Sequence, residues 1–121
     1  MPPKFYELHG VRVLECSNEE PLRTYADAVD IVGKSFENGA TLIVIPVECL
    51  DDDFFRLQTR IAGELIQKFV QYHRRVAIVG DISRHLAQSS ALRAFVNESN
   101  RGKQVWFLAT REELDERLRQ V

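Results

Sequence analysis

The sequence lacks the features that assign a chain to several broad classes of protein. Its 16 Lys and Arg residues are outnumbered by 18 Asp and Glu residues, so it has no basic surplus to hold a nucleic-acid backbone. No apolar run approaches the ~18 residues that a membrane-spanning helix needs. The cysteines, Cys16 and Cys49, stand far apart without a CxxC spacing. We therefore expect no nucleic-acid partner, no membrane association and reduced thiols.

Targeting and cofactor signals are equally scarce. The first residues do not combine positive charge with an apolar stretch, as a signal peptide does, and this favours a cytoplasmic protein. Neither Gly63 nor Gly80 belongs to a GxGxxG motif or a P-loop, so we predict no nucleotide cofactor. The acidic residues 51–53 lack EF-hand spacing. We interpret them as a cap for the following helix rather than as a metal site.

What the sequence does contain is an alternation of apolar runs and amphipathic segments. Two short runs, residues 5–8 and 11–14, flank His9-Gly10 in the manner of a β-hairpin. Continuous apolar runs at 42–47, 76–79 and 105–108 fit strands buried on both faces of a parallel sheet. The order ββαβαβαβα predicts a single α/β domain over residues 1–121. Its five-stranded sheet should be mostly parallel, with an antiparallel first strand.

Helical periodicity and capping residues define the segments between these strands. The first helix begins after Thr24, and its apolar face should pack on the sheet. The longest helix is predicted over residues 54–73, and others over 89–99 and after Thr110. The apolar face of the first helix comprises Tyr25, Ala28, Val29, Val32 and Phe36.

Polar residues follow the strands at the edge where parallel strands end, and open α/β sheets bind ligands at that edge. Glu48 follows the third strand, and Asp81, Ser83 and His85 follow the fourth. The last three could suggest a nucleophile with its base, but a catalytic triad is defined by geometry rather than by closeness in sequence. Gly80-Asp81 is equally explained as a sharp turn. We therefore predict a polar edge and no catalytic residues, which favours a non-enzyme.

Several short motifs occur in combination along the chain: Asp53-Phe54-Phe55, Ala62-Gly63-Glu64, Ala77-Ile78-Val79-Gly80-Asp81 with Ser83, and Glu98-Ser99-Asn100-Arg101-Gly102. Together they resemble the bacterial family catalogued as domain of unknown function 4180. The resemblance covers nearly the whole chain after the first hairpin, and it implies no activity that can be transferred. It leads us to expect Gly where this chain has Arg60.

The element order also resembles the STAS domain, the fold of bacterial anti-sigma-factor antagonists. In that family a phosphorylatable Ser or Thr begins the helix after a central strand, and a Gly follows closely. Thr59 and Gly63 stand in comparable places here. The resemblance implies a regulatory module, on fold-level analogy.

Two functions from different classes follow. The first, which we favour, is a regulatory protein-binding module with Asp53, Thr59 and Arg60 at its docking edge. Phosphate on Thr59 would add about two negative charges there, and nearby arginines could hold it or its acidic neighbours could be repelled. The alternative is a small-ligand-binding protein or minor enzyme that uses Glu48, Asp81, Ser83 and His85. A homodimer through the exposed edge of the N-terminal strands is also open.

Overall fold

The strands follow the apolar runs of the sequence. In the computed structural model, which describes residues 3–120, β1 (Lys4–Leu8) and β2 (Val11–Glu15) form an antiparallel hairpin. β3 (Leu42–Pro46), β4 (Arg75–Val79) and β5 (Val105–Leu108) continue parallel to β2. The described residues form a five-stranded sheet of order β1-β2-β3-β4-β5. This confirms the predicted fold class and its antiparallel first strand.

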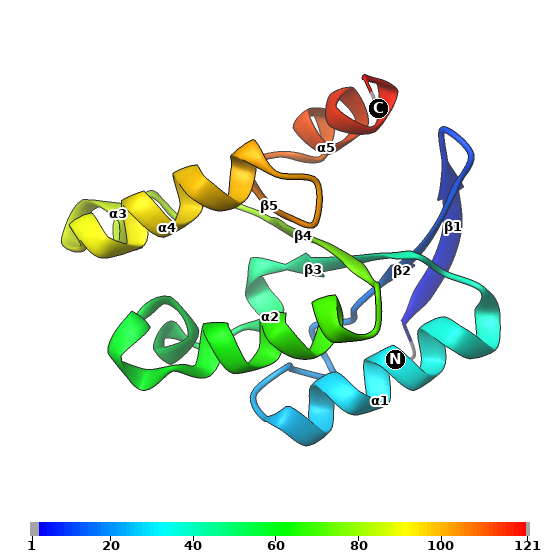
Figure 1. The fold of residues 1–121 in the computed structure, drawn as a ribbon, viewed down its shortest axis with the longest axis horizontal. Coiled ribbons are helices and arrows are strands. Elements are labelled where there is room, and N and C mark those ends of the chain that lie inside the picture. The colour runs from blue at the N-terminus through cyan, green and yellow to red at the C-terminus, as the bar shows by residue number, and fades with distance from the viewer. Residues whose placement is uncertain (1–2, 121) are drawn as a thin grey trace.

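The helices cover the two faces of the sheet unequally (Figure 1). α1 (Tyr25–Asn38), α2 (Ile61–Gln71) and α4 (Ser90–Arg101) share one core with the strands, while α5 (Arg111–Arg119) packs on the opposite face. The three crossover helices lie together because each right-handed connection joins neighbouring strands in the same direction. A short helix, α3 (Ser83–Gln88), precedes α4 and was not predicted. Within the described residues, no helix has the length and apolarity needed to cross a bilayer.

The segment after β3 departs most from the prediction. Instead of a helix over 54–73, three 3-10 turns precede α2: η1 (Val47–Cys49), η2 (Asp52–Phe55) and η3 (Leu57–Thr59). Arg60 follows them with a φ of 66°, a left-handed conformation that no continuous helix accommodates. Thr59 and Arg60 therefore stand before the helix rather than inside it.

The predicted face of α1 is only half correct. Ala28 and Val32 are buried, but Tyr25, Val29 and Phe36 are 56%, 42% and 54% exposed. A helix lying on a sheet buries an arc of its surface, and the apolar arc of α1 is wider than the arc the sheet covers. α1 begins after Thr24 as expected, with a Thr24–Asp27 capping box, and a left-handed Gly39 ends it.

Candidate functional site

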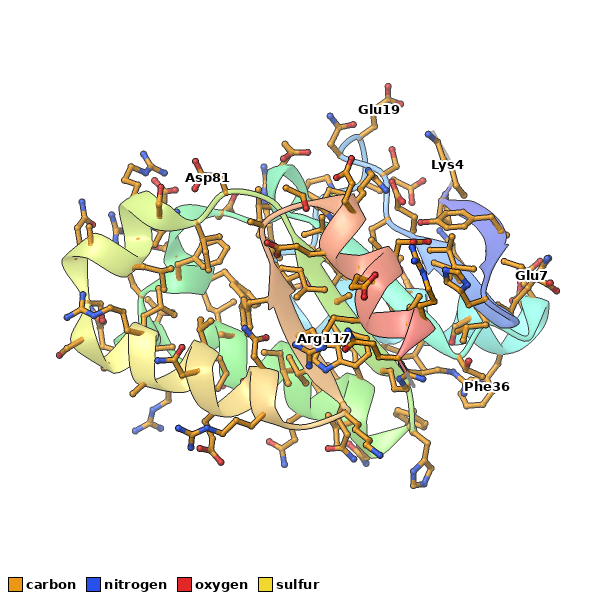
Figure 2. The ribbon with its side chains drawn as sticks, turned by 90° about the horizontal axis from the view of Figure 1, so that it is seen from above. Lys4, Glu7, Glu19, Phe36, Asp81 and Arg117 are labelled. Carbon is orange, nitrogen blue, oxygen red and sulfur yellow. The ribbon has the colours of Figure 1, made fainter. Side chains whose placement is uncertain are left out.

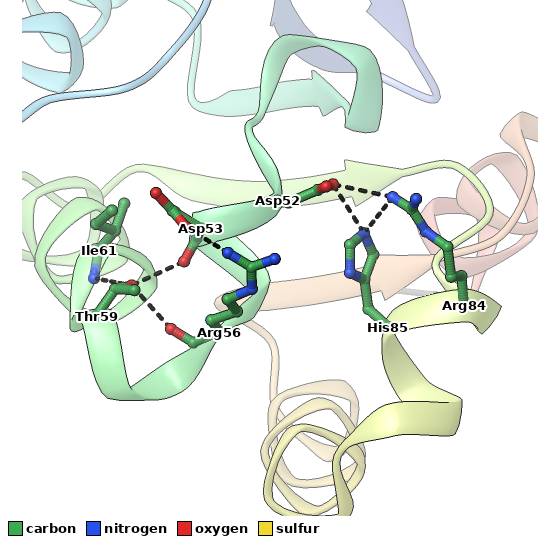
Figure 3. A network of polar contacts seen from close by, with 7 residues as sticks. All are labelled: Asp52, Asp53, Arg56, Thr59, Ile61, Arg84 and His85. Carbon is green, nitrogen blue, oxygen red and sulfur yellow. Dashed lines mark hydrogen bonds and ion pairs between the residues drawn. The ribbon is translucent and has the colours of Figure 1, made fainter.

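Two loops meet at the carboxyl edge of the sheet, one after β3 and one after β4 (Figure 3). Arg84 Nη2 of α3 lies 2.9 Å from Asp52 Oδ1 of η2, and His85 Nε2 lies 3.6 Å from the same oxygen. A cavity of about 340 Å³ opens beside them, with Arg56 and Gln88 in its lining. This pairing joins residues 32 positions apart and defines the first candidate site.

His85 is held in a fixed orientation within this site. Its ring stacks on Phe55 with the centroids 4.4 Å apart and an interplanar angle of 15°. Burial and the positive charge of Arg84 lower the pKa of His85, although the Asp52 carboxylate opposes them. Arg84 Nη2 also lies 3.4 Å from His85 Nε2. The lowered pKa favours the neutral form of the imidazole.

The Thr59 hydroxyl holds the turns before α2 together. Thr59 Oγ1 lies 2.7 Å from the Asp53 carbonyl oxygen and 2.8 Å from that of Arg56, and it accepts a hydrogen bond from Ile61 N at 3.3 Å. Arg56 Nη1 also donates to Asp53 Oδ1 at 2.9 Å. The structure thus brings Asp53 and Thr59 together, with the side chain of Arg60 exposed beside them.

The acidic residues 51–53 do not cap a helix through their side chains, so that interpretation is wrong. Asp51 precedes η2 without a capping hydrogen bond from its side chain. Each carboxylate instead pairs with an arginine: Asp51 with Arg23 at 3.2 Å, Asp52 with Arg84 and Asp53 with Arg56. The physical reason is that Asp52 and Asp53 begin a 3-10 turn, with Asp51 just before it, and do not stand at the N-terminus of an α-helix.

Asp81 and Ser83 shape the turn that leads into α3. Asp81 Oδ1 accepts a hydrogen bond from Ser83 N at 2.9 Å, and this bonding lowers the pKa of the exposed Asp81. Asp81 lies at the surface and projects outward (Figure 2). Among the described residues, Ser83 and His85 share no hydrogen bond. They therefore do not form a pair of nucleophile and base, although they are close in sequence.

Glu48 lies in a different groove, of about 440 Å³, which also contains Glu15 and Arg111. The Glu15 side chain is 9% exposed and forms a bidentate pair with Arg111, with bonds of 2.6 and 2.7 Å. Tyr6 Oη donates to the same carboxylate at 2.6 Å. We did not predict this cluster. The signal available was a glutamate directly after the apolar residues Val13 and Leu14, because a charge in such a place needs a partner.

In this cluster the Glu15 carboxylate has hydrogen-bond donors on both of its oxygens. Burial disfavours the Glu15 carboxylate, but hydrogen bonds from Arg111 and Tyr6 outweigh it and lower the pKa of Glu15. The same carboxylate raises the pKa of Arg111, and burial together with Glu15 raises the pKa of Tyr6. Because its three members satisfy one another, the cluster ties the β1–β2 hairpin to α5 rather than offering a reactive group.

Comparison with known proteins identifies the family. A family model described as a domain of unknown function, DUF4180, matches residues 8–118. The chain belongs to the DUF4180 family. No curated protein matches the chain, and no solved structure does.

The motif residues of this DUF4180 chain divide between the two edges of the sheet. Asp53, Asp81 and Ser83 lie at the carboxyl edge, whereas Asn100 precedes β5 at the opposite edge. Asn100 Oδ1 accepts from Phe107 N at 2.7 Å, and its Nδ2 donates to the Phe107 carbonyl at 3.1 Å. Asn100 thereby pairs with backbone groups of β5, the last strand of the described sheet, on the side that has no neighbouring strand there.

Proposed function

We propose that this DUF4180 chain is a regulatory protein-binding module whose partner docks on the carboxyl-edge loops. The supporting observation is the surface formed by Asp52, Asp53, Arg56 and Arg84. Their side chains are 55–69% exposed and paired with one another, while Phe54 and Phe55 beneath them are buried. Charges that pair across two loops give a defined polar surface, which suits specific recognition more than chemistry. The STAS-like element order agrees with this role by analogy.

Regulation is proposed to act through Thr59. A kinase that moves a phosphoryl group from ATP to Thr59 Oγ1 would remove the hydroxyl hydrogen that faces the Asp53 and Arg56 carbonyls. The added charge would lie near Arg56 and Arg60 and before the N-terminus of α2, but also near Asp53. The turns η2 and η3 would then rearrange, and with them the docking surface.

Pull-down from the native host tests this proposal with wild type, Thr59→Ala and Thr59→Glu. We expect a partner that wild type retains and Thr59→Glu loses. Thr41→Glu is the matched control, since Thr41 is exposed before β3 at the opposite edge. No partner, or the same partners for both Thr59 variants, would contradict the proposal.

A small-ligand site is the second candidate, and the cavity beside His85 favours it. Its lining combines Arg56, Arg84 and the His85 imidazole over the Phe55 ring, as polar groups over an apolar floor do in ligand sites. A ligand that binds only the folded chain must raise its thermal stability. An unchanged melting temperature across a panel of metabolites and metal ions would contradict this candidate.

A further inference from the structure

A stripe of exposed apolar side chains runs along α1 toward the end of α2. Tyr25, Val29 and Phe36 lie on one face of α1, and Tyr72 follows α2 with 41% of its surface exposed. The Phe36 and Tyr72 rings meet edge to face with centroids 6.3 Å apart, and Phe36 stands at the periphery of the molecule (Figure 2). Four large apolar side chains this exposed and this close mark an interaction surface rather than scattered surface residues.

The stripe borders a groove that has a lysine in its wall. The groove measures about 540 Å³ and is lined by Tyr25, Glu64, Gln67, Lys68 and Gln71. Lys68 is 7% exposed, yet no carboxylate of the described residues lies within ion-pair distance of its ammonium group. Lys68 Nζ is held by Gln71 Oε1 at 3.2 Å and by the Tyr25 and Tyr72 rings, with centroids 4.4 and 5.3 Å away. A lysine this buried usually has an acidic partner.

Arg74 adds a second positive charge at the far end of the stripe. Its guanidinium lies 3.9 Å from the Phe36 centroid, and its Nε donates to Ser35 Oγ at 2.9 Å. No carboxylate of the described chain pairs with it either. The stripe therefore carries two cations on aromatic rings, and the exposed Glu64 lines the groove together with Lys68.

The size of the stripe selects its occupant. An aromatic side chain contributes ~150–250 Å² when fully buried, so three half-exposed rings and a valine offer roughly 300–400 Å². A standard interface between folded domains takes about 800 Å² from each partner, of which roughly 57% is apolar. The stripe supplies less apolar surface than that, which favours a short peptide segment over a second copy of this chain.

We propose that the groove between α1 and α2 binds a short segment of another protein that carries a carboxylate next to an aromatic or aliphatic side chain. The carboxylate pairs with Lys68 and faces the Arg74 end of the stripe, while apolar side chains along the segment pack on Tyr25, Val29 and Phe36. This site goes beyond the proposed function, because it uses neither the carboxyl-edge loops nor Thr59.

Selection from a displayed library of random 12-residue peptides, with the full chain as bait, tests the proposal. We expect the enriched peptides to combine Asp or Glu with Phe, Trp or Leu. The best of them should bind Lys68→Gln and Phe36→Ser at least tenfold more weakly than wild type, since a charged hydrogen bond contributes ~1.5–3 kcal/mol. Lys103→Gln, an exposed lysine before β5, is the matched control and should bind like wild type. Glu64→Gln should bind as tightly or more tightly.

The variants are compared only after circular dichroism shows that they are folded. If Lys68→Gln does not fold, Phe36→Ser still tests the proposal, because it changes an exposed side chain. Absence of enrichment, enrichment of basic or neutral peptides, or equal binding by wild type and both variants would overturn the proposal. A concentration-dependent dimer that Phe36→Ser abolishes would also overturn it and assign the stripe to a second copy.

Discussion

Replacing Arg111 by Met should destabilise the fold by leaving a buried carboxylate short of partners. Glu15 is 9% exposed at its side chain, and without the guanidinium its remaining side-chain hydrogen bond within the described residues comes from the Tyr6 hydroxyl. Removal of one partner from a buried pair costs ~3–5 kcal/mol. Arg111 is itself 57% exposed, so water reaches part of the gap and we expect about 2 kcal/mol. Urea unfolding at pH 7 with linear extrapolation measures this free energy.

The loss of stability in Arg111→Met should also depend on pH, and it should be larger at neutral than at acidic pH. The folded pKa of Glu15 is lowered, so its contribution to stability is present above the unfolded pKa and is lost as the pH falls through the folded pKa. The difference between wild type and Arg111→Met should therefore be full at pH 7. It should shrink as the pH falls and Glu15 takes up a proton, first in the folded variant, which lacks the guanidinium, and then in folded wild type.

Arg101→Met is the control, because Arg101 and Glu98 form an ion pair in which both side chains are more than three-quarters exposed, 77% and 76%. Such a pair contributes less than about 0.5 kcal/mol. The reasoning would be refuted if Arg111→Met cost no more than Arg101→Met, or if its cost at pH 3 equalled that at pH 7.

Three further predictions concern the carboxyl edge. Arg60→Gly should stabilise the fold by up to ~1 kcal/mol in urea unfolding, because relief of the left-handed strain exceeds the added freedom of the unfolded chain. Gly80→Ala should cost ~3 kcal/mol, since φ is 144° and the new Cβ would overlap the Val47 side chain, and Val47→Ala should restore part of the loss. NMR titration of His85 should give a pKa below its ordinary value, and Asp52→Asn should lower it further.

The sheet could be predicted because its strands are specified locally. Each continuous apolar run became a buried strand at nearly the predicted residues, and Pro46 ends β3 as a residue without an N–H should. The turns before α2 could not be predicted in this way, because arginine is a good helix former and nothing local indicates its left-handed conformation. The family resemblance suggested Gly at position 60, and the φ of 66° supplies the physical reason for a Gly there.

The residues that follow β4 were predicted in place, but their contacts were not, and Glu48 lies in a different groove. The sequence positioned Asp81, Ser83 and His85 after β4 correctly, since strand ends fix the loops. It could not show that His85 would stack on Phe55 or that Arg84 would pair with Asp52, because these contacts depend on how two loops close over the sheet. The Glu15–Arg111 pair spans 96 residues and depends on the placement of α5 in the same way.

The wrong prediction on α1 and the proposed groove have one physical origin. Burying a side chain such as Phe36 would stabilise the fold by roughly 1.5–3 kcal/mol, yet the fold leaves its ring more than half exposed, at 54%. Arg74 lies against the Phe36 ring and Lys68 against the Tyr25 ring rather than against carboxylates, and this arrangement supports the proposed peptide site. The apolar arc of α1 is wider than its own core buries, and the excess, Tyr25, Val29 and Phe36, is the surface on which the proposed peptide would pack.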